Sequence, residues 1–247
     1  MTADHPSDYG ETFAAVYDAW YGSVSDVAAT VATVAELTQD RPVVELGVGT
    51  GRLALPLAER GHRVIGIDAS RSMLARCREK EGSTSLVLIR ADMAAIPIGR
   101  RAAIGVTFVA FNTFFNLTDE SRQRRCLEGV KTMLEPGGRF IVEAFVPGDE
   151  PAERQYRESS RPDGAGGQIL TTSVRDPADQ TVRGVHIHTS ATQNVTRLPW
   201  AIHYLHPDQL DTLCADTGLD LVDRWSSWNG ATFDDSADRH ISTYRTG

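Results

Sequence analysis

Short β-branched runs alternate with helical stretches between residues 42 and 146, and this alternation constrains the fold more than any other feature. Regular alternation of this kind indicates βαβ units and a parallel sheet with helices on both faces. After residue 205 one further helix and two strands follow, and we expect these strands to form an antiparallel pair at the sheet edge. The sequence therefore predicts a doubly wound, mostly parallel seven-stranded α/β sheet. The expected strands are 42–46, 62–67, 86–89, 105–110, 139–146, 219–225 and 240–245, and the expected helices between them are 52–60, 70–80, 119–134 and 207–217.

The N-terminal segment carries an aromatic helical face. Residues 8–40 are expected to form a helical lid on a single domain that spans residues 1–247. The apolar side chains at helical spacing in the first part of this lid are Phe13, Val16, Tyr17, Trp20 and Tyr21.

Residues 150–205 interrupt the alternation and are expected to form a small antiparallel β insertion over the rim of the sheet. Most of this segment has the composition of extended strands, with a turn at 176–179 and a break near 197–199. Residues 150–167 are rich in Glu, Arg, Ser and Gly, so we expect a mobile loop there.

The stretch VVELGVGTGRLA begins in the first expected strand and continues with three glycines in alternate positions. Open α/β sheets bind ligands at the carboxyl ends of their strands, so Gly47, Gly49 and Gly51 should lie on that rim. A dinucleotide fingerprint needs a third glycine where this chain has Arg52, so the loop does not match a pyrophosphate-binding turn. Asp68 ends the next strand about 20 residues after the first glycine, which is the position of a ribose-binding carboxylate. These residues predict a ribosyl ligand without the usual pyrophosphate turn; a turn that only packs on its own helix is the alternative.

The formal net charge of −8 argues against a nucleic-acid partner, because phosphate neutralisation requires clustered Lys and Arg. No stretch is apolar enough to span a bilayer and no secretory signal is visible, so a cytoplasmic protein is expected. Cys77, Cys126 and Cys214 lie far apart without a CxxC pair, a pattern typical of neither a zinc site nor a disulfide framework. We therefore expect no metal, no membrane and no nucleic acid as partner, and a monomer or homodimer.

Four stretches, VVELGVGTGRL, VIGIDAS, RADM and LEPGGRFIVEAF, resemble in order the motifs of class I S-adenosylmethionine-dependent methyltransferases. The resemblance covers about residues 10–146 and, more loosely, 205–245. FVAFNTFFNL, YDAWYG and RWSSWNGATF are similar to bacterial small-molecule members of this family, of the secondary-metabolite type. The resemblance implies a Rossmann-like methyltransferase fold, S-adenosyl-L-methionine as cofactor, S-adenosyl-L-homocysteine as product and a small-molecule acceptor such as a natural product or sugar amine.

The same resemblance implies which residues hold the cofactor. Asp68 would take both ribose hydroxyls, and a carboxylate that accepts two hydrogen bonds suits a vicinal diol. Asp92 with Met93 would hold the adenine, whose exocyclic amine donates naturally to a carboxylate. The residues expected to bind the cofactor are Tyr17, Glu45, Gly47, Gly49, Gly51, Asp68, Ala69, Met73, Asp92, Met93 and Phe111, of which 45–51 border the methionyl end.

Methyl transfer from a sulfonium is an in-line displacement, and much of its acceleration can come from positioning the acceptor. An amine acceptor needs only a free lone pair, whereas a hydroxyl usually needs a general base. His203 is the preferred base if the acceptor is a hydroxyl, and nitrogen, oxygen and carbon acceptors all stay open. The residues expected near the acceptor are Tyr17, Trp20, Tyr21, Asn112, Phe115, His203 and Tyr204.

His186 and His188 alternate within one expected strand and therefore share one of its faces. Two histidines without a third ligand at fitting spacing are weak grounds for a metal site. A solvated sheet face is expected instead.

Two other functions stay open beside methyl transfer. A nicotinamide-dependent oxidoreductase would use a similar fold, but Arg52 stands where its loop needs glycine. A protein of this fold can also bind S-adenosylmethionine in a non-methylating role, because catalysis by positioning leaves no obligatory catalytic residue to look for. Methyl transfer to a small molecule is the leading hypothesis.

Overall fold

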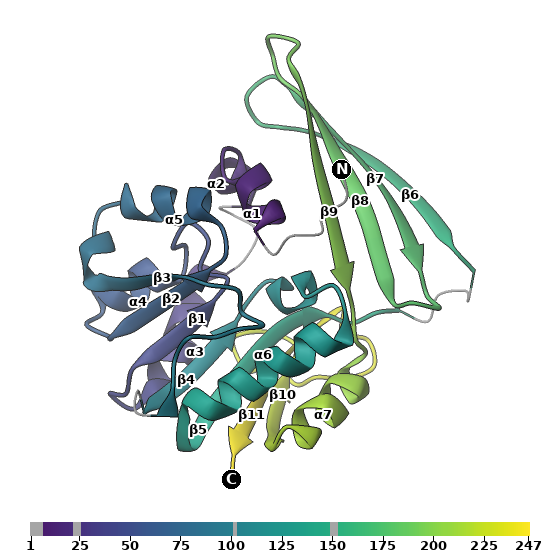
Figure 1. Cartoon of the computed structure of the whole chain (residues 1–247). Coiled ribbons are helices and arrows are strands. Elements are labelled where there is room, and N and C mark those ends of the chain that lie inside the picture. Colours follow the sequence, from purple (N-terminus) through teal and green to yellow (C-terminus); the bar gives the residue numbers. More distant parts are fainter. Residues whose placement is uncertain (1–6, 22–25, 101–102, 149–152) are drawn as a thin grey trace.

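The computed structural model describes residues 7–21, 26–100, 103–148 and 153–247, and a seven-stranded sheet forms its centre (Figure 1). The strand order is β10-β11-β5-β4-β1-β2-β3. The strands from β5 to β3 pair in parallel, whereas β11 is antiparallel to both of its neighbours. The predicted doubly wound, mostly parallel sheet with an antiparallel pair at one edge is confirmed. The strands are β1 (Val43–Leu46), β2 (Val64–Asp68), β3 (Leu86–Arg90), β4 (Ile104–Val109), β5 (Leu134–Phe145), β10 (Leu219–Trp225) and β11 (Arg239–Thr246).

Helices cover both faces of this sheet, and one buried apolar cluster holds each set in place. Val31, Leu57 and Leu74 pack on one face, while Leu127 and Leu213 pack on the other. None of the described helices combines the length and apolar character needed to cross a membrane. The helices are α3 (Val27–Thr38), α4 (Ala54–Glu59) and α5 (Arg71–Arg78) on the first face, and α6 (Glu120–Met133) and α7 (Pro207–Asp216) on the second.

Side-chain caps fix where three of these helices begin. Oγ of Ser70 accepts a hydrogen bond from the Met73 N–H at 3.1 Å and so caps α5. Asp26 and Asp119 cap α3 and α6 in the same way. Caps of this type stabilise a helix by about 1 kcal/mol. The cap of α5 also bears on the site, because Ser70 lies only two residues after Asp68 and the helix therefore begins close to the end of β2.

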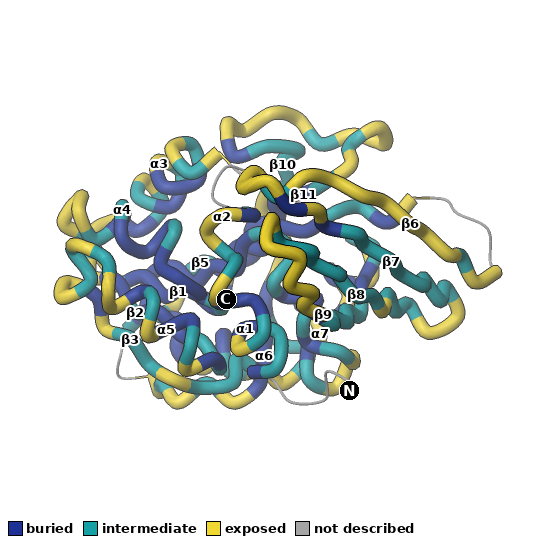
Figure 2. Tube along the Cα trace, turned by 90° about the horizontal axis from the view of Figure 1, so that it is seen from above, coloured by how far each residue is buried: buried dark blue, intermediate teal, exposed yellow. Residues whose placement is uncertain are grey.

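A second sheet, the insertion sheet, contains four antiparallel strands in the order β6-β7-β8-β9, and Figure 1 shows it beside α1 and α2. The loop expected at 150–167 is wrong for residues 155–162, because β6 pairs with β7 along its whole length. Residues 163–167 connect these two strands, and residues 150–152 lie outside the described part. β6 is exposed on both faces (Figure 2), so the alternating apolar pattern that marks a strand is missing. The strands are β6 (Gln155–Pro162), β7 (Gln168–Asp176), β8 (Thr181–Thr189) and β9 (Val195–His203).

The break expected near 197–199 is also wrong. β9 continues through these residues, with Pro199 opposite Val185 in the register. Because β9 is an edge strand of the insertion sheet, a residue without an N–H is tolerated in it. The chain turns earlier, where the Ser190 N–H donates to the carbonyl of Asn194.

The N-terminal aromatic segment consists of two short helices, α1 (Asp8–Phe13) and α2 (Tyr17–Tyr21), rather than one continuous helix. Phe13 and Trp20 from these helices form a third apolar cluster with Ile169 of β7 and Leu198 of β9. The N-terminal helices are therefore held against the insertion sheet, and both lie at the carboxyl ends of the central strands (Figure 1).

Candidate active site

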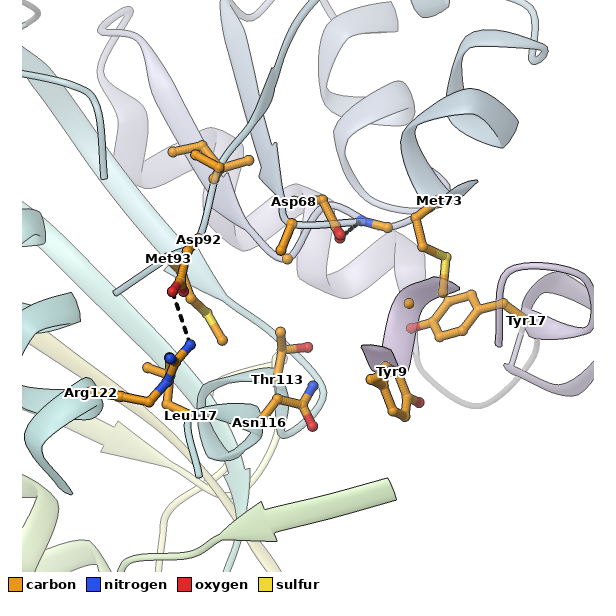
Figure 3. A pocket seen from close by; sticks show the side chains of 16 residues that line it. Tyr9, Tyr17, Asp68, Met73, Asp92, Met93, Thr113, Asn116, Leu117 and Arg122 are labelled. Carbon is orange, nitrogen blue, oxygen red and sulfur yellow. Dashed lines mark hydrogen bonds and ion pairs between the residues drawn. The ribbon is translucent and has the colours of Figure 1, made fainter. Parts of the chain in front are cut away.

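A pocket, here called the rim pocket, opens at the carboxyl ends of β1, β2 and β3 beneath the N-terminal helices (Figure 3). Most of the residues expected to bind the cofactor lie in its wall, brought together by the parallel strand order. The lining residues are Tyr9, Gly10, Tyr17, Gly47, Gly49, Ile67, Asp68, Ala69, Met73, Ala91, Asp92, Met93, Thr113, Asn116, Leu117 and Arg122.

The loop after β1 reaches the pocket because two of its residues are glycines. Gly47 and Gly49 have φ angles of 70° and 54°, a left-handed region in which a residue with a side chain is strained. A Cβ atom on Gly47 would also lie 2.3 Å from Cγ2 of Thr113. The close approach of the loop to the 3₁₀-helix η3 (Thr113–Asn116) therefore requires glycine at position 47.

Asp68 at the end of β2 is oriented by two backbone groups. Its Oδ2 accepts from the Gly49 N–H at 2.9 Å (Figure 3). Its Oδ1 accepts from the Ser70 N–H at 2.8 Å. Burial raises the pKa of this carboxyl, and the two backbone hydrogen bonds oppose that shift. Each carboxylate oxygen has two lone pairs, so one on each oxygen can accept from a neighbouring pair of hydroxyls.

Asp92 is fixed in a comparable way on another wall of the pocket. Its Oδ1 accepts from the Ala94 N–H at 2.9 Å, and its Oδ2 forms an ion pair with the Arg122 guanidinium at 2.9 Å (Figure 3). Arg122 lies in the first turn of α6, so this pair ties that helix to the loop after β3. The contact leaves acceptor sites on Asp92 for a donor in the pocket.

Glu45 lies on β1 just before the glycine loop, and it is buried. Its Oε2 has no hydrogen-bond partner among the residues described. Burial raises the pKa of this carboxyl to about 8, and the positive charge of Arg52 opposes the shift. An ionised buried carboxylate is costly without partners, so the site suits a ligand that brings a positive charge.

A second cavity of about 210 Å³, here called the aromatic pocket, adjoins the rim pocket. The two cavities share Tyr9, Tyr17, Thr113 and Asn116, and the insertion sheet closes the far wall of the second. The described residues that line the aromatic pocket include no carboxylate, lysine or arginine. They are Tyr9, Tyr17, Tyr21, Phe111, Asn112, Thr113, Asn116, Phe145, His186, Trp200 and Ile202.

His186 and His188 share one face of β8, but the expectation that this face is solvated is wrong. The ring centroid of Trp20 lies 5.8 Å from that of His186 and 5.3 Å from that of His188. Nδ1 of His186 is hydrogen-bonded to the hydroxyl of Thr171 at 2.7 Å. The two N-terminal helices pack on this face and bury it, which strand alternation alone cannot reveal.

The titratable side chains of the aromatic pocket are neutral near pH 7. Burial, together with the smaller effect of the positive charge of Arg161, lowers the pKa of His186 to about 4. Burial raises the pKa of Tyr17 to about 12 and also raises those of Tyr9 and Tyr21. The pocket therefore presents a neutral imidazole and neutral phenols.

The geometry of η3 decides which residues after β4 reach the pockets. A 3₁₀-helix has three residues per turn, so Thr113 and Asn116 share one face, and this face lines both pockets. Phe115, expected near the acceptor, is fully buried in the core on another face. Asn112 lines the aromatic pocket, and its Oδ1 accepts from the Phe145 N–H at 2.7 Å.

Four other expected residues lie outside the walls of these two pockets. Trp20 packs between the N-terminal helices and the insertion sheet, and Tyr204 is buried in the core. Glu45 lies in the strand below the glycine loop, and Gly51 faces Cys77, whose Sγ would lie 2.6 Å from an added Cβ. Phe111, expected at the cofactor, lines the aromatic pocket instead of the rim pocket.

His203 lies at the end of β9 and contacts α6. Its Nδ1 is 3.2 Å from Oε1 of Gln123, and its carbonyl accepts from Nε2 of the same side chain at 2.8 Å. Burial lowers the pKa of its imidazole. The contact ties the insertion sheet to α6, and His203 is not among the residues that line either pocket.

Several lining residues were missed by the sequence reasoning. Tyr9 precedes Phe13 by four residues and so shares its helical face, a signal that was available. Arg122, His186 and Trp200 carry no such local signal, because packing of α6 and of the insertion sheet brings them to the site.

Comparisons with known proteins agree with this geometry. The family described as "Methyltransferase domain" matches residues 43–138. The cypemycin N-terminal methyltransferase of Streptomyces sp is 30% identical over 194 residues, which cover 76% of this chain and 77% of that protein.

Solved structures resemble nearly the whole chain. The CcbJ methyltransferase from Streptomyces caelestis is 33% identical with a TM-score of 0.89, over 98% of this chain and 99% of that one. CalS10, an amino pentose methyltransferase from Micromonospora echinaspora, has a TM-score of 0.69 at 17% identity, over 94% of this chain and 97% of that one. The second likeness is one of fold alone.

Proposed function

This chain belongs to the class I S-adenosylmethionine-dependent methyltransferases of the secondary-metabolite type, and we propose that it methylates an amine nitrogen of a small natural product. One observation carries the choice of nitrogen: the described residues of the aromatic pocket include no group that readily accepts a proton near pH 7. A hydroxyl acceptor needs such a base, whereas an uncharged amine already offers a lone pair. The relative named as an N-terminal methyltransferase is consistent with an amine acceptor.

We assign the rim pocket to S-adenosylmethionine, because the functional groups of this cofactor match the residues that line the pocket. Asp68 offers two acceptor sites for the ribose diol, and Asp92 offers acceptor sites for the adenine amine. The glycine loop of Gly47 and Gly49 would border the methionyl end, and Glu45 with its unpartnered Oε2 lies in the strand just below this loop. When bound, this cofactor supplies a methyl group attached to a cationic sulfur.

The remaining catalytic contribution is positioning by the chain's own residues. Tyr9, Tyr17, Thr113 and Asn116 belong to both pockets, so they border the place where acceptor and cofactor meet. The faces of the aromatic walls attract the positive charge that develops on the amine nitrogen as the methyl group is transferred. Holding two reactants in line can lower the activation barrier by up to about 7–11 kcal/mol, and this effect requires no proton transfer.

The acceptor atom is tested with matched pairs of an amine and the alcohol of the same carbon skeleton, including an amino sugar and its parent sugar. We expect transfer to the amine alone, with a rate that rises with pH up to the pKa of the acceptor ammonium group. Product mass spectrometry identifies the methylated atom. An O-methylated product would contradict the proposal, as would a pH profile of the amine reaction that changes when His203 is replaced by glutamine.

The affinity for S-adenosylhomocysteine should depend on pH through Glu45. The pKa of this carboxyl is about 8 in the structure, and the α-ammonium group of the ligand, bound beside the glycine loop, would favour its ionised form. Binding therefore releases a proton below this pKa, so the affinity should rise with pH up to about 8 and then level off. Calorimetry in buffers of different ionisation enthalpy measures the proton release. Glu45→Gln should abolish it, and an affinity that is constant from pH 6 to 8 would show that Glu45 does not titrate on binding.

A further inference from the structure

A third cavity, of about 310 Å³ and here called the arginine pocket, continues from the aromatic pocket under the insertion sheet. Residues 145–148, at and just after the end of β5, form one side of it, and Arg157, Ser173 and Arg175 from the insertion sheet form the other. Phe145 and Trp200 line both cavities, so the two are neighbours separated by these rings.

Strand register places the polar groups of this cavity on one face of the insertion sheet. Arg157 lies opposite Ser173, which lies opposite Gly184, which in turn lies opposite Trp200. Arg175 follows Ser173 by two residues and therefore shares its face. A Cβ on Gly184 would lie 2.4 Å from Cζ2 of Trp200, so the missing side chain lets the indole lie across the strand. That indole forms the wall between the two cavities.

The charges that line the arginine pocket favour an anion. Two guanidinium groups and a hydroxyl line it, and its described lining residues include no carboxylate. Nε of Arg175 donates to the hydroxyl of Tyr204 at 2.9 Å, and the guanidinium carbon lies 4.9 Å from the centre of that ring. Both arginines take part in other interactions as well, but a guanidinium has five N–H donors and can serve a ligand in addition.

The indole of Trp200 supplies an independent observation. Its Nε1–H is buried and has no acceptor among the residues described. An unpaired buried donor destabilises the free protein, and an acceptor brought by a ligand would remove that cost. The adjacent cavity carries positive charge, so an anionic oxygen is the acceptor that suits it.

We propose that the arginine pocket binds a carboxylate of the acceptor, so that the substrate is an amine that also carries an acid group, as amino-acid and peptide derivatives do. This proposal rests on the proposed amine methylation, since it assigns the amine to the aromatic pocket and the carboxylate to the cavity behind Trp200. Guanidinium groups bind carboxylates through paired, charge-assisted hydrogen bonds, which gives this cavity selectivity for the acid over its amide.

The test compares N-acetyl-phenylalanine with its amide on the full-length protein loaded with S-adenosylhomocysteine. Calorimetry should show that the acid binds at least about tenfold more tightly than the amide. Arg175→Gln and Arg157→Gln should each reduce this preference, whereas Arg175→Lys should retain part of it. Arg183→Gln is the matched control, because Arg183 is exposed on the opposite face of β8 and should leave the preference unchanged.

Equal affinities for the acid and the amide, or no detectable binding of the acid, would overturn the proposal. A preference that survives both arginine substitutions, or that is lost equally in Arg183→Gln, would also overturn it. Neither probe has a free amine, so these outcomes are independent of methyl transfer. If the proposed amine methylation is wrong, only the methyl-transfer assay with matched amines and alcohols will show it.

Discussion

Replacement of Asp68 by alanine should weaken the binding of S-adenosylhomocysteine by about 100-fold or more. The carboxylate is already oriented by the Gly49 and Ser70 N–H groups, and it offers one acceptor site on each oxygen to a ribose diol. Two hydrogen bonds to a charged acceptor contribute about 1.5–3 kcal/mol each, and 1.4 kcal/mol corresponds to a tenfold change in affinity. The substitution also leaves the Gly49 N–H without its acceptor and so loosens the glycine loop. Isothermal titration measures the affinity.

Asp220→Ala is the control for this substitution, because Asp220 is exposed on β10 at the far edge of the sheet. Its affinity for the ligand should equal that of the unchanged protein. Asp68→Asn keeps one oxygen and the shape of the side chain, so its affinity for the ligand should lie between those of the unchanged protein and Asp68→Ala. If Asp68→Ala folds normally and binds the ligand undiminished, the assignment of this carboxylate to the ribose is wrong.

The central sheet could be predicted from sequence because its strands are buried and therefore leave a compositional signal. β1 and β4 are buried along their whole length, and both were predicted within one or two residues of their ends. β6 could not be predicted, since its polar, exposed side chains have no apolar period and its stability comes from pairing with β7. The local sequence therefore predicts strands that are buried. It does not predict an exposed strand such as β6, which is held in place by its backbone hydrogen bonds.

The rim pocket and the aromatic pocket also differ in how far the sequence predicts their residues. Asp68 and Asp92 follow parallel strands directly, so the topology alone places them on the rim. His186 and Trp200 belong to the insertion sheet, and their role in the aromatic pocket depends on how that sheet packs on α1 and α2. Phe115 was expected near the acceptor because it follows β4. A 3₁₀-helix has three residues per turn, so Asn116 lies on the pocket face of η3 and Phe115 does not.

Replacement of Gly47 by alanine should destabilise the protein and abolish most cofactor binding. The left-handed backbone at this residue costs about 1–2 kcal/mol with any ordinary side chain. The added Cβ would also lie 2.3 Å from Cγ2 of Thr113, so either the glycine loop or η3 must move, and both line the rim pocket. We expect a total loss of about 2–4 kcal/mol in the free energy of unfolding, measured by urea denaturation.

Two further variants separate the strain of the backbone from the contact with Thr113. Gly61 has a φ angle of 89° but no atom within 4 Å of an added Cβ, so Gly61→Ala should show the backbone strain alone. Thr113→Ser removes only the Cγ2 atom that an alanine at position 47 would meet, and the double variant should therefore recover about 1–2 kcal/mol relative to the sum of the single changes. Affinity for S-adenosylhomocysteine should recover in parallel when it is compared with Thr113→Ser. If Gly47→Ala is no more destabilising than Gly61→Ala, or if serine at 113 gives no recovery, then close packing against η3 is not the reason for glycine in this loop.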